Sequence, residues 1–164
     1  MTRQILILIA FILLSCSKKQ VNYDLYISNS NYELNLKTGD LKINWYNNYK
    51  DKIELSTNEK NQINKLIFKY NVDTFKGEKN VFGEEPLIMP NFNDKFTLTK
   101  NNKIESEISI STQVNLEKSK LNKIDADIYN FKTEIFKLLS QNKDFERNMD
   151  TVKIANKKIK RLFL

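Results

Sequence analysis

Hydrophobic and polar residues alternate along much of the first two thirds of the chain, which is the pattern of β-strands with one buried face. The alternating runs cover residues 23–27, 32–36, 41–45, 96–98 and 104–110, and Ile53 with Leu55 suggests one more short strand. Gly39 lies between the second and third runs, and Asn101-Asn102 lies between the last two. Both residue types tolerate the positive φ of tight turns, so two hairpins are expected.

The last of these runs has the cleanest alternation. Ile104, Ser106, Ile108 and Ile110 are expected to share one face, and Glu105, Glu107 and Ser109 to point away from it. Such alternation is typical of an antiparallel sheet with one face on the core and the other in water.

A middle helix is predicted over about residues 57–71. Ser56 and Glu59 have the spacing of a capping box, in which each side chain bonds the backbone N–H of the other residue. The residues behind them carry one apolar stripe at helical spacing.

The last third of the chain is also helical in pattern. Apolar residues recur in a heptad-like register from residue 121 to residue 163. One coiled-coil helix, with Asn142 and Asn156 as polar core positions, is one interpretation. Two helices packed on the sheet are favoured, because residues 140–144 look like a helix end and a restart. The predicted fold is α+β: an antiparallel sheet of about five to six strands built from two hairpins, packed by a middle helix and a long C-terminal helical region.

Residues 72–95 break both periodicities, and two of the three glycines and both prolines lie there. A loop of this length in a small domain is usually functional or disordered, and its aromatic content argues against disorder. The candidate interaction residues in it are Phe75, Phe82, Glu84, Glu85 and Phe92. The favoured alternative is that the phenylalanines cover the open end of the sheet.

The N-terminus has the layout of a secretory signal. Arg3 precedes an apolar run over residues 5–14, and small and polar residues follow it. The run is about half as long as a membrane-spanning helix needs to be. We therefore expect it to direct export and not to hold the chain in a membrane.

Leu13-Leu14-Ser15-Cys16 resembles the lipobox of bacterial lipoproteins. The resemblance implies cleavage between Ser15 and Cys16, a diacylglyceryl group on the Cys16 thiol and acylation of the freed amine. Two or more acyl chains give a stable membrane anchor where one barely does. The position after Cys16 is Ser17 and not Asp, which within this resemblance favours the outer membrane, on its periplasmic side or its surface, over the inner membrane.

These features divide the chain into four parts. They are a signal peptide (1–15), a lipidated tether (16–22), an α+β domain (23–140) and a basic C-terminal helical segment (141–164). The order of strands and helices resembles small exported domains of bacterial lipoproteins that have no assigned activity.

The formal net charge of +7 is concentrated near the C-terminus. The candidate contacts with an anionic surface are Lys157, Lys158, Lys160 and Arg161. A basic amphipathic helix can lie on anionic lipid. The favoured alternative is that its apolar side docks on the domain. The rest of the chain is nearly neutral, and export from the cytoplasm also argues against nucleic-acid binding.

Composition removes most catalytic chemistry. The chain has no histidine, its single cysteine is the one proposed for lipidation, and none of its three glycines lies in a phosphate-binding motif. Histidine-based triads, ordinary zinc sites and nucleotide loops are therefore excluded. No cofactor or metal is expected.

Carboxylates and aromatic residues remain as candidates. Asp73, Glu78, Glu84, Glu85 and Asp94 lie in or beside the irregular segment. They are interpreted as solvated, with weak Ca²⁺ binding or glycoside hydrolysis as alternatives. Trp45, Tyr46, Tyr49 and Tyr70 are interpreted as the edge of the core, with a carbohydrate platform as the alternative.

The sequence thus favours a membrane-anchored, non-enzymatic envelope domain that binds a protein or another envelope component. One alternative is a lipoprotein inhibitor or immunity protein that acts through residues 72–95. The other is a carboxylate-dependent hydrolase.

Mass spectrometry of the native protein tests the anchor. We expect a chain that begins at Cys16 and carries acyl mass. An intact N-terminus, or a processed one without acyl mass, would contradict the lipobox interpretation.

Overall fold

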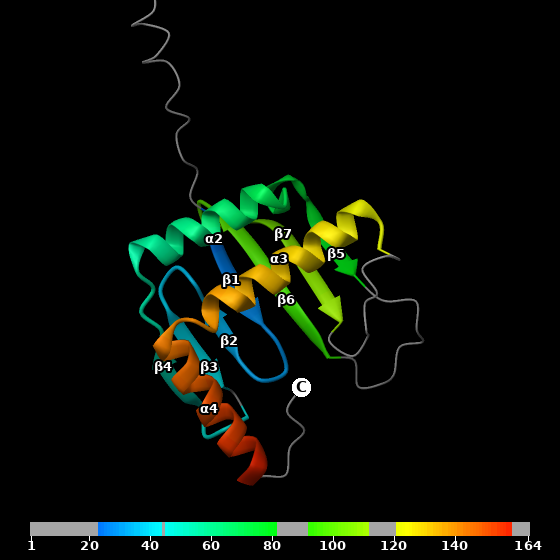
Figure 1. The fold of residues 1–164 in the computed structure, drawn as a ribbon. Helices are drawn as coiled ribbons and strands as arrows, with labels where there is room; N and C mark the ends of the chain where they lie inside the picture. The colour runs from blue at the N-terminus through cyan, green and yellow to red at the C-terminus, as the bar shows by residue number, and fades with distance from the viewer. Residues whose placement is uncertain (1–22, 44, 82–91, 112–120, 159–164) are drawn as a thin grey trace, which may run out of the picture.

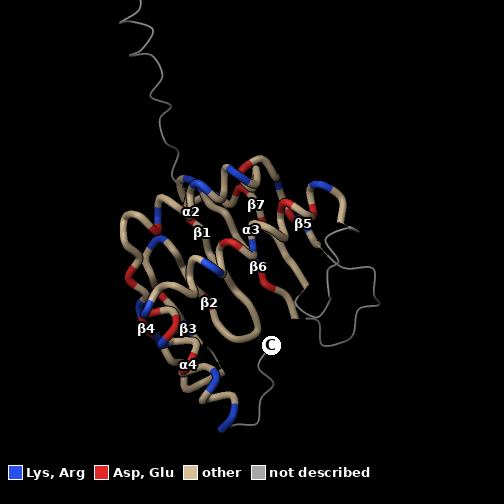
Figure 2. The backbone as a smooth tube through the Cα atoms, viewed as in Figure 1, with Lys and Arg blue, Asp and Glu red and all other residues tan. Residues whose placement is uncertain are grey.

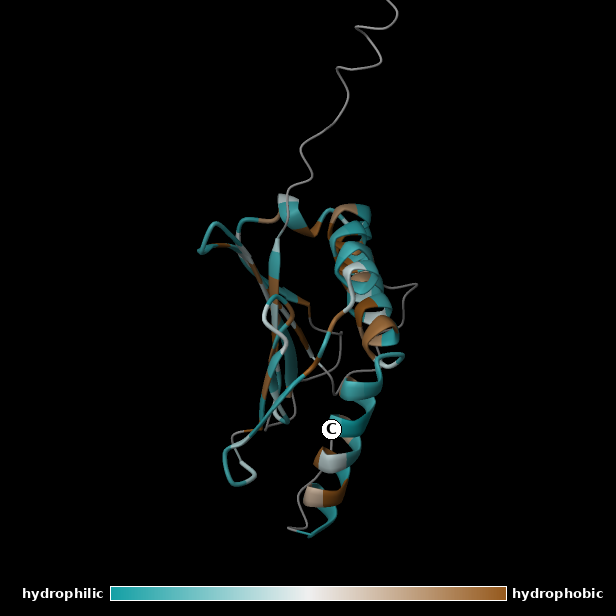
Figure 3. Cartoon of the chain, turned by 90° about the vertical axis from the view of Figure 1, so that its left-hand side faces the viewer, coloured by the Kyte–Doolittle hydropathy of each residue, from teal (hydrophilic) through white to brown (hydrophobic). Residues whose placement is uncertain are grey.

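In the computed structural model, residues 23–43, 45–81, 92–111 and 121–158 are described (Figure 1). The strands are β1 (Asp24–Ser28), β2 (Glu33–Asn35), β3 (Asp40–Ile43), β4 (Tyr49–Lys52), β5 (Gly77–Val81), β6 (Asn93–Lys100) and β7 (Lys103–Ser111). The helices are α2 (Thr57–Lys69), α3 (Lys123–Leu139) and α4 (Lys143–Lys158), with a short 3-10 turn η1 (Val72–Thr74). Figure 3 shows the strands as one layer, with α3 and α4 on one side of it.

The described strands form one sheet of seven, in the order β4-β3-β2-β1-β6-β7-β5. Every neighbouring pair is antiparallel except β5 with β7, which is parallel. The α+β class is confirmed, and the sheet has more strands than predicted.

The hydrophobic pattern placed β4 at the wrong residues and did not predict β5. These two strands lie at the edges of the sheet. β4 covers Tyr49–Lys52 instead of Ile53 and Leu55, and none of its residues is fully buried. β5 lies within the segment predicted to be irregular, and only its last residue, Val81, is buried. An edge strand that buries so little side-chain surface carries no hydrophobic alternation to detect.

Both predicted hairpins are present. β2 pairs with β3 around Gly39, whose φ is +80°, and β6 pairs with β7 around Asn101 and Asn102, whose φ values are 50° and 60°. The helix α2 begins after Ser56, and the predicted capping box with Glu59 is formed in full.

A β-bulge changes the predicted face of one residue. Leu98 is opposite Ser106 and Thr99 is opposite Ile104, so Glu105 on β7 has no partner of its own. The extra residue reverses the alternation, and Ile104 is 64% exposed instead of sharing the buried face of Ser106, Ile108 and Ile110.

The core lies between the sheet and the helices. On α3, buried Ile128, Phe131 and Ile135 form one stripe, and the Phe131 ring packs edge-on against Phe96 of β6 at 5.5 Å between centroids. Such aromatic pairs are stabilising beyond the area that they bury.

The C-terminal region forms two helices, as favoured, and not one coiled coil. α3 ends at Leu139 and α4 begins at Lys143. Phe145 and Val152 of α4 belong to the same hydrophobic core as the sheet residues. The apolar side of α4 is therefore docked on the domain.

Gly39→Ala tests the first hairpin. The side chain would need an unfavourable positive φ and would also overlap the backbone carbonyl of Ile53. We expect a loss of about 3 kcal/mol in the free energy of unfolding, measured by urea denaturation. Gly77→Ala is the matched control, because Gly77 has a φ of +74° but no atom lies within 4 Å of the added carbon. It should lose only about 1 kcal/mol, and equal losses would contradict the steric argument.

Candidate functional site

The candidate site is a cleft of about 610 Å³ at the end of the domain where β1 begins. Four segments that are far apart in the sequence surround it: the start of β1, the end of β2 with the turn after it, the first half of α2 and the β6–β7 turn. Its lining residues are Tyr23, Asp24, Leu25, Leu36, Lys37, Thr57, Lys60, Asn61, Ile63, Asn64, Asn101 and Asn102.

The cleft has an apolar floor and a polar rim. Leu25, Leu36 and Ile63 are almost completely buried beneath it. The rim carries amide groups and lysines, of which Lys60 and Asn61 on α2 are exposed. A polar rim over an apolar floor is suited to binding a ligand that offers polar or anionic groups.

The side of the cleft next to β1 is held in place by local contacts. The Tyr23 backbone N–H donates to Asn64 Oδ1 at 3.2 Å, which joins the start of β1 to α2. Lys37 Nζ lies 2.7 Å from the Asp24 carboxylate, so this lysine is paired. The Tyr23 ring packs edge-on against Phe68 at 5.8 Å.

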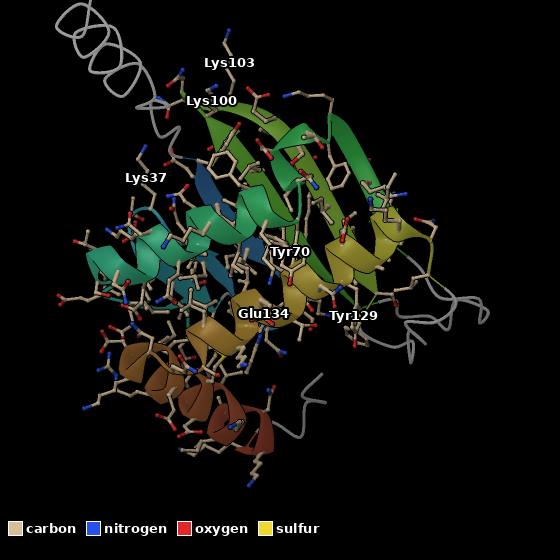
Figure 4. All side chains as sticks on the ribbon, turned by 45° about the horizontal axis from the view of Figure 1, so that its top comes forward. Lys37, Tyr70, Lys100, Lys103, Tyr129 and Glu134 are labelled. Atoms are coloured by element: carbon tan, nitrogen blue, oxygen red, sulfur yellow. The ribbon has the colours of Figure 1, made fainter. Side chains whose placement is uncertain are left out.

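More lysines border the cleft on the β6–β7 turn. Lys100 and Lys103 are opposite each other across the hairpin, and Lys100 Nζ lies 5.8 Å from the centre of the Tyr23 ring. Figure 4 shows Lys37, Lys100 and Lys103 at the same end of the domain. Lys76 pairs with Glu105, and this hydrogen bond and charge keep the pKa of Glu105 below its ordinary value.

A second polar cluster lies where α4 meets β4. Asp51 Oδ2 accepts hydrogen bonds from Asn148 Nδ2 and Arg147 Nη2, each at 2.9 Å. Burial alone would raise the pKa of Asp51, but these bonds and one from the Lys52 N–H outweigh it and lower that pKa. The Tyr49 hydroxyl donates to Asn148 Oδ1 at 3.1 Å. The cluster joins two elements and has a structural role.

Asp94 belongs to a buried ion pair. Its carboxylate lies 2.6 Å from Lys132 Nζ of α3 and accepts a hydrogen bond from Asn29 Nδ2 at 3.0 Å. The Asp94 side chain is only 8% exposed. A carboxylate that is buried and paired in this way holds α3 to the sheet, because breaking the pair would leave a buried charge. The sequence interpretation, which had Asp94 as a solvated carboxylate, is therefore wrong for this residue.

The candidate loop residues are only partly described. Phe75 and Phe92 are half-buried, and Phe75 packs against the core. Phe82, Glu84 and Glu85 lie outside the described residues. Because residues 72–74 form η1, 77–81 form β5 and 93–95 begin β6, the prediction of one irregular segment over 72–95 is wrong for these parts.

The remaining candidates are not part of the lining of the cleft, although Asp73 interacts with the lining residue Tyr23. Lys157 and Lys158 are exposed on α4, whereas Lys160 and Arg161 lie outside the described residues. Glu78 is exposed on β5, and Asp73 is half-buried in η1. The aromatic residues Trp45, Tyr46 and Tyr49 pack against the core, and Tyr70 is part of it. Figure 2 shows acidic and basic residues distributed over the described elements.

Sequence reasoning missed the cleft. Its rim residues are ordinary turn and helix residues, and only the pairing of β1 with both β2 and β6 brings the two turns to the same end. The one available signal was the accumulation of asparagine and lysine in both turns and in the first turns of α2.

The chain matches no known protein family, no characterised protein and no solved structure. None of the helices in the described part of the chain combines the length and apolarity needed to cross a membrane. Within the same ranges, acidic and sulfur- or imidazole-bearing side chains do not gather in a group of three or more that could hold a metal ion.

Stability at low pH tests the role of Asp51. The pKa of Asp51 in the folded protein is below its ordinary value of 3.8, so the ionised form stabilises the fold. This contribution is present above the unfolded pKa and is lost as pH falls through the lower folded value. At pH 7, Asp51→Asn should lower the free energy of unfolding by about 1 kcal/mol, and the difference from wild type should shrink as pH falls below about 4.

Asp150→Asn is the matched control, because Asp150 is 61% exposed and its one ion pair among the described residues is with Lys153 in the next turn. It should change stability little at any pH. A constant difference between wild type and Asp51→Asn from pH 7 to pH 2 would contradict the assignment.

Proposed function

We propose that this protein is a lipid-anchored, non-enzymatic binding protein of the bacterial cell envelope. The observation that carries the proposal is the position of the cleft. It is lined by Tyr23, the first described residue, and therefore lies seven residues after the proposed lipidation site Cys16. A binding site at the base of a short tether stays close to the membrane that holds the tether.

The state of the carboxylates supports a non-enzymatic role. A general acid needs a raised pKa to be protonated near neutral pH. Asp51, Glu59 and Glu105, the described carboxylates whose pKa is shifted, all have a lowered pKa. Each is held by hydrogen bonds to a neighbouring element or residue, which suits a structural role.

The chemistry of the cleft suggests the class of ligand. Amide groups donate and accept hydrogen bonds, and lysine ammonium groups attract anions. The apolar floor is too deeply buried to offer much contact surface. The cleft therefore suits an envelope component that presents anionic or hydroxyl groups.

Photo-cross-linking in intact cells tests the proposal. A photoreactive side chain in place of Asn61, on the exposed rim, should form an adduct with an envelope component. The same side chain in place of Glu146, which is exposed on α4, should not form that adduct. Lys60→Glu should weaken the Asn61 adduct, because it reverses a charge on the rim.

The outcome also separates this proposal from an inhibitor or immunity role. An adduct with the mass of a lipid or glycan supports binding of an envelope component at the cleft. An adduct with one protein partner that forms equally at both positions, or no adduct at position 61, would contradict it.

A further inference from the structure

We infer that the cleft end of the domain docks on an anionic phospholipid surface, so that α4 is held away from the membrane. The inference deepens the proposed function and rests on the anchor at Cys16. The docking surface consists of Lys60, Lys100 and Lys103, with paired Lys37 beside them, and we call it the lysine end.

The strand registers place these residues together. Asp24 at the start of β1 is opposite Thr99, so the β6–β7 turn with Lys100 and Lys103 lies at that end. The Leu36 N–H donates to the Leu25 carbonyl at 2.9 Å, which brings the turn with Lys37 to the same end. Lys60 lines the cleft between these turns.

The lysines are available for an external anion. Lys60 and Lys103 are exposed, and neither forms an ion pair with a described residue. Lys100 Nζ lies 5.8 Å from the centre of the Tyr23 ring and forms no ion pair with a described residue. The nearby carboxylate of Glu105 is paired with Lys76. Phospholipid phosphates at an anionic surface attract such groups and strengthen docking about fivefold for each lysine.

The length of the tether decides which end faces the membrane. Tyr23 lies seven positions after Cys16, and a fully extended chain over those seven steps spans at most about 25 Å. A folded chain of the described size is roughly 35 Å across. Figures 1 and 3 place the last turn of α4 at the opposite end of the domain from the start of β1.

The tether is therefore too short for the domain to stand inverted on its own membrane. The exposed lysines of α4, Lys157 and Lys158, are also basic, but the tether excludes the inverted arrangement in which they would be the lysines that face the membrane. The tether also allows the domain to lie on its side. The attraction of the lysine end to the anionic surface favours the upright arrangement, in which the lysine end faces the membrane.

Two exposed isoleucines allow a direct measurement of orientation. Ile104 beside the lysine end is 64% exposed, and Ile154 on α4 is 56% exposed. Cysteine at either position gives a single reactive thiol in the mature protein, because Cys16 is acylated. Each thiol is labelled with a fluorophore, and the protein is reconstituted into phosphatidylcholine vesicles with about one third phosphatidylglycerol and a quencher on the lipid headgroups.

We expect strong quenching of the label at position 104 and little at position 154. Changing Lys60, Lys100 and Lys103 to Gln should lower the ratio of docked to undocked protein about a hundredfold. Quenching at position 104 should then fall to the level seen in vesicles of phosphatidylcholine alone. Changing Lys143, Lys157 and Lys158 to Gln, which removes three exposed lysines of α4, is the matched control and should leave quenching unchanged.

Equal quenching at the two positions would overturn the inference, as would quenching at position 104 that does not depend on the three lysines. Mass spectrometry of the same sample shows whether the protein carries acyl groups, and so distinguishes failure of the docking surface from failure of the anchor. If the mature protein carries no acyl group, the anchor is wrong, and the variants are then made with Cys16→Ser, so that one thiol is labelled, and are added to the vesicles from solution. Lysine-dependent binding through position 104 would still support the docking surface, and absence of binding would overturn it too.

Discussion

The side chain of Asn142 joins the start of α4 to α2 and to the segment before α2, and the position of α4 depends on it. Its Nδ2 group donates to the Glu54 carbonyl at 3.0 Å and to Glu59 Oε1 at 2.9 Å. Its Oδ1 accepts from the N–H groups of Asp144 and Phe145 at 3.0 and 3.1 Å. Both donors and both acceptor positions of the amide are therefore used, although the residue is buried. A fully satisfied buried amide fixes geometry, because any shift of α4 would leave polar groups without partners.

This contact links the start of α4 to the start of α2. Glu59 accepts a hydrogen bond from the Asn142 side chain and also one from the Ser56 N–H in the capping box. One carboxylate therefore binds groups at the starts of both helices. Burial alone would raise the pKa of Glu59, but these hydrogen bonds outweigh it and lower that pKa. The same first turns of α2 carry Lys60 and Asn61 on the rim of the cleft. The orientation of α4 and the shape of the cleft are thus set from one end of α2.

Much of the fold could be predicted because its signals are local. The turn at Gly39, the turn at Asn101 and Asn102, and the capping box at Ser56 each depend on a few neighbouring residues. The edge strands β4 and β5 carry no such signal, since they bury little. The bulge opposite Thr99 is also a property of strand pairing, so the exposure of Ile104 could not be read from alternation. The candidate interaction loop over residues 72–95 was defined by its composition and its lack of periodicity. Parts of it are strands of the sheet, because β5 and the start of β6 lie within it.

By itself the sequence determined the class of fold, the two hairpin turns, the start of α2 and the break between α3 and α4. Each of these depends on backbone preferences and on burial patterns within a few residues along the chain. Only the tertiary structure decided the cleft, the partners of Asp51 and Asp94, and the end of the domain at which the basic turns meet. Those features join residues that are tens of positions apart, such as Asn29 with Asp94 and Tyr49 with Asn148. Such pairs are fixed by strand order and helix docking, which no short pattern in the chain records.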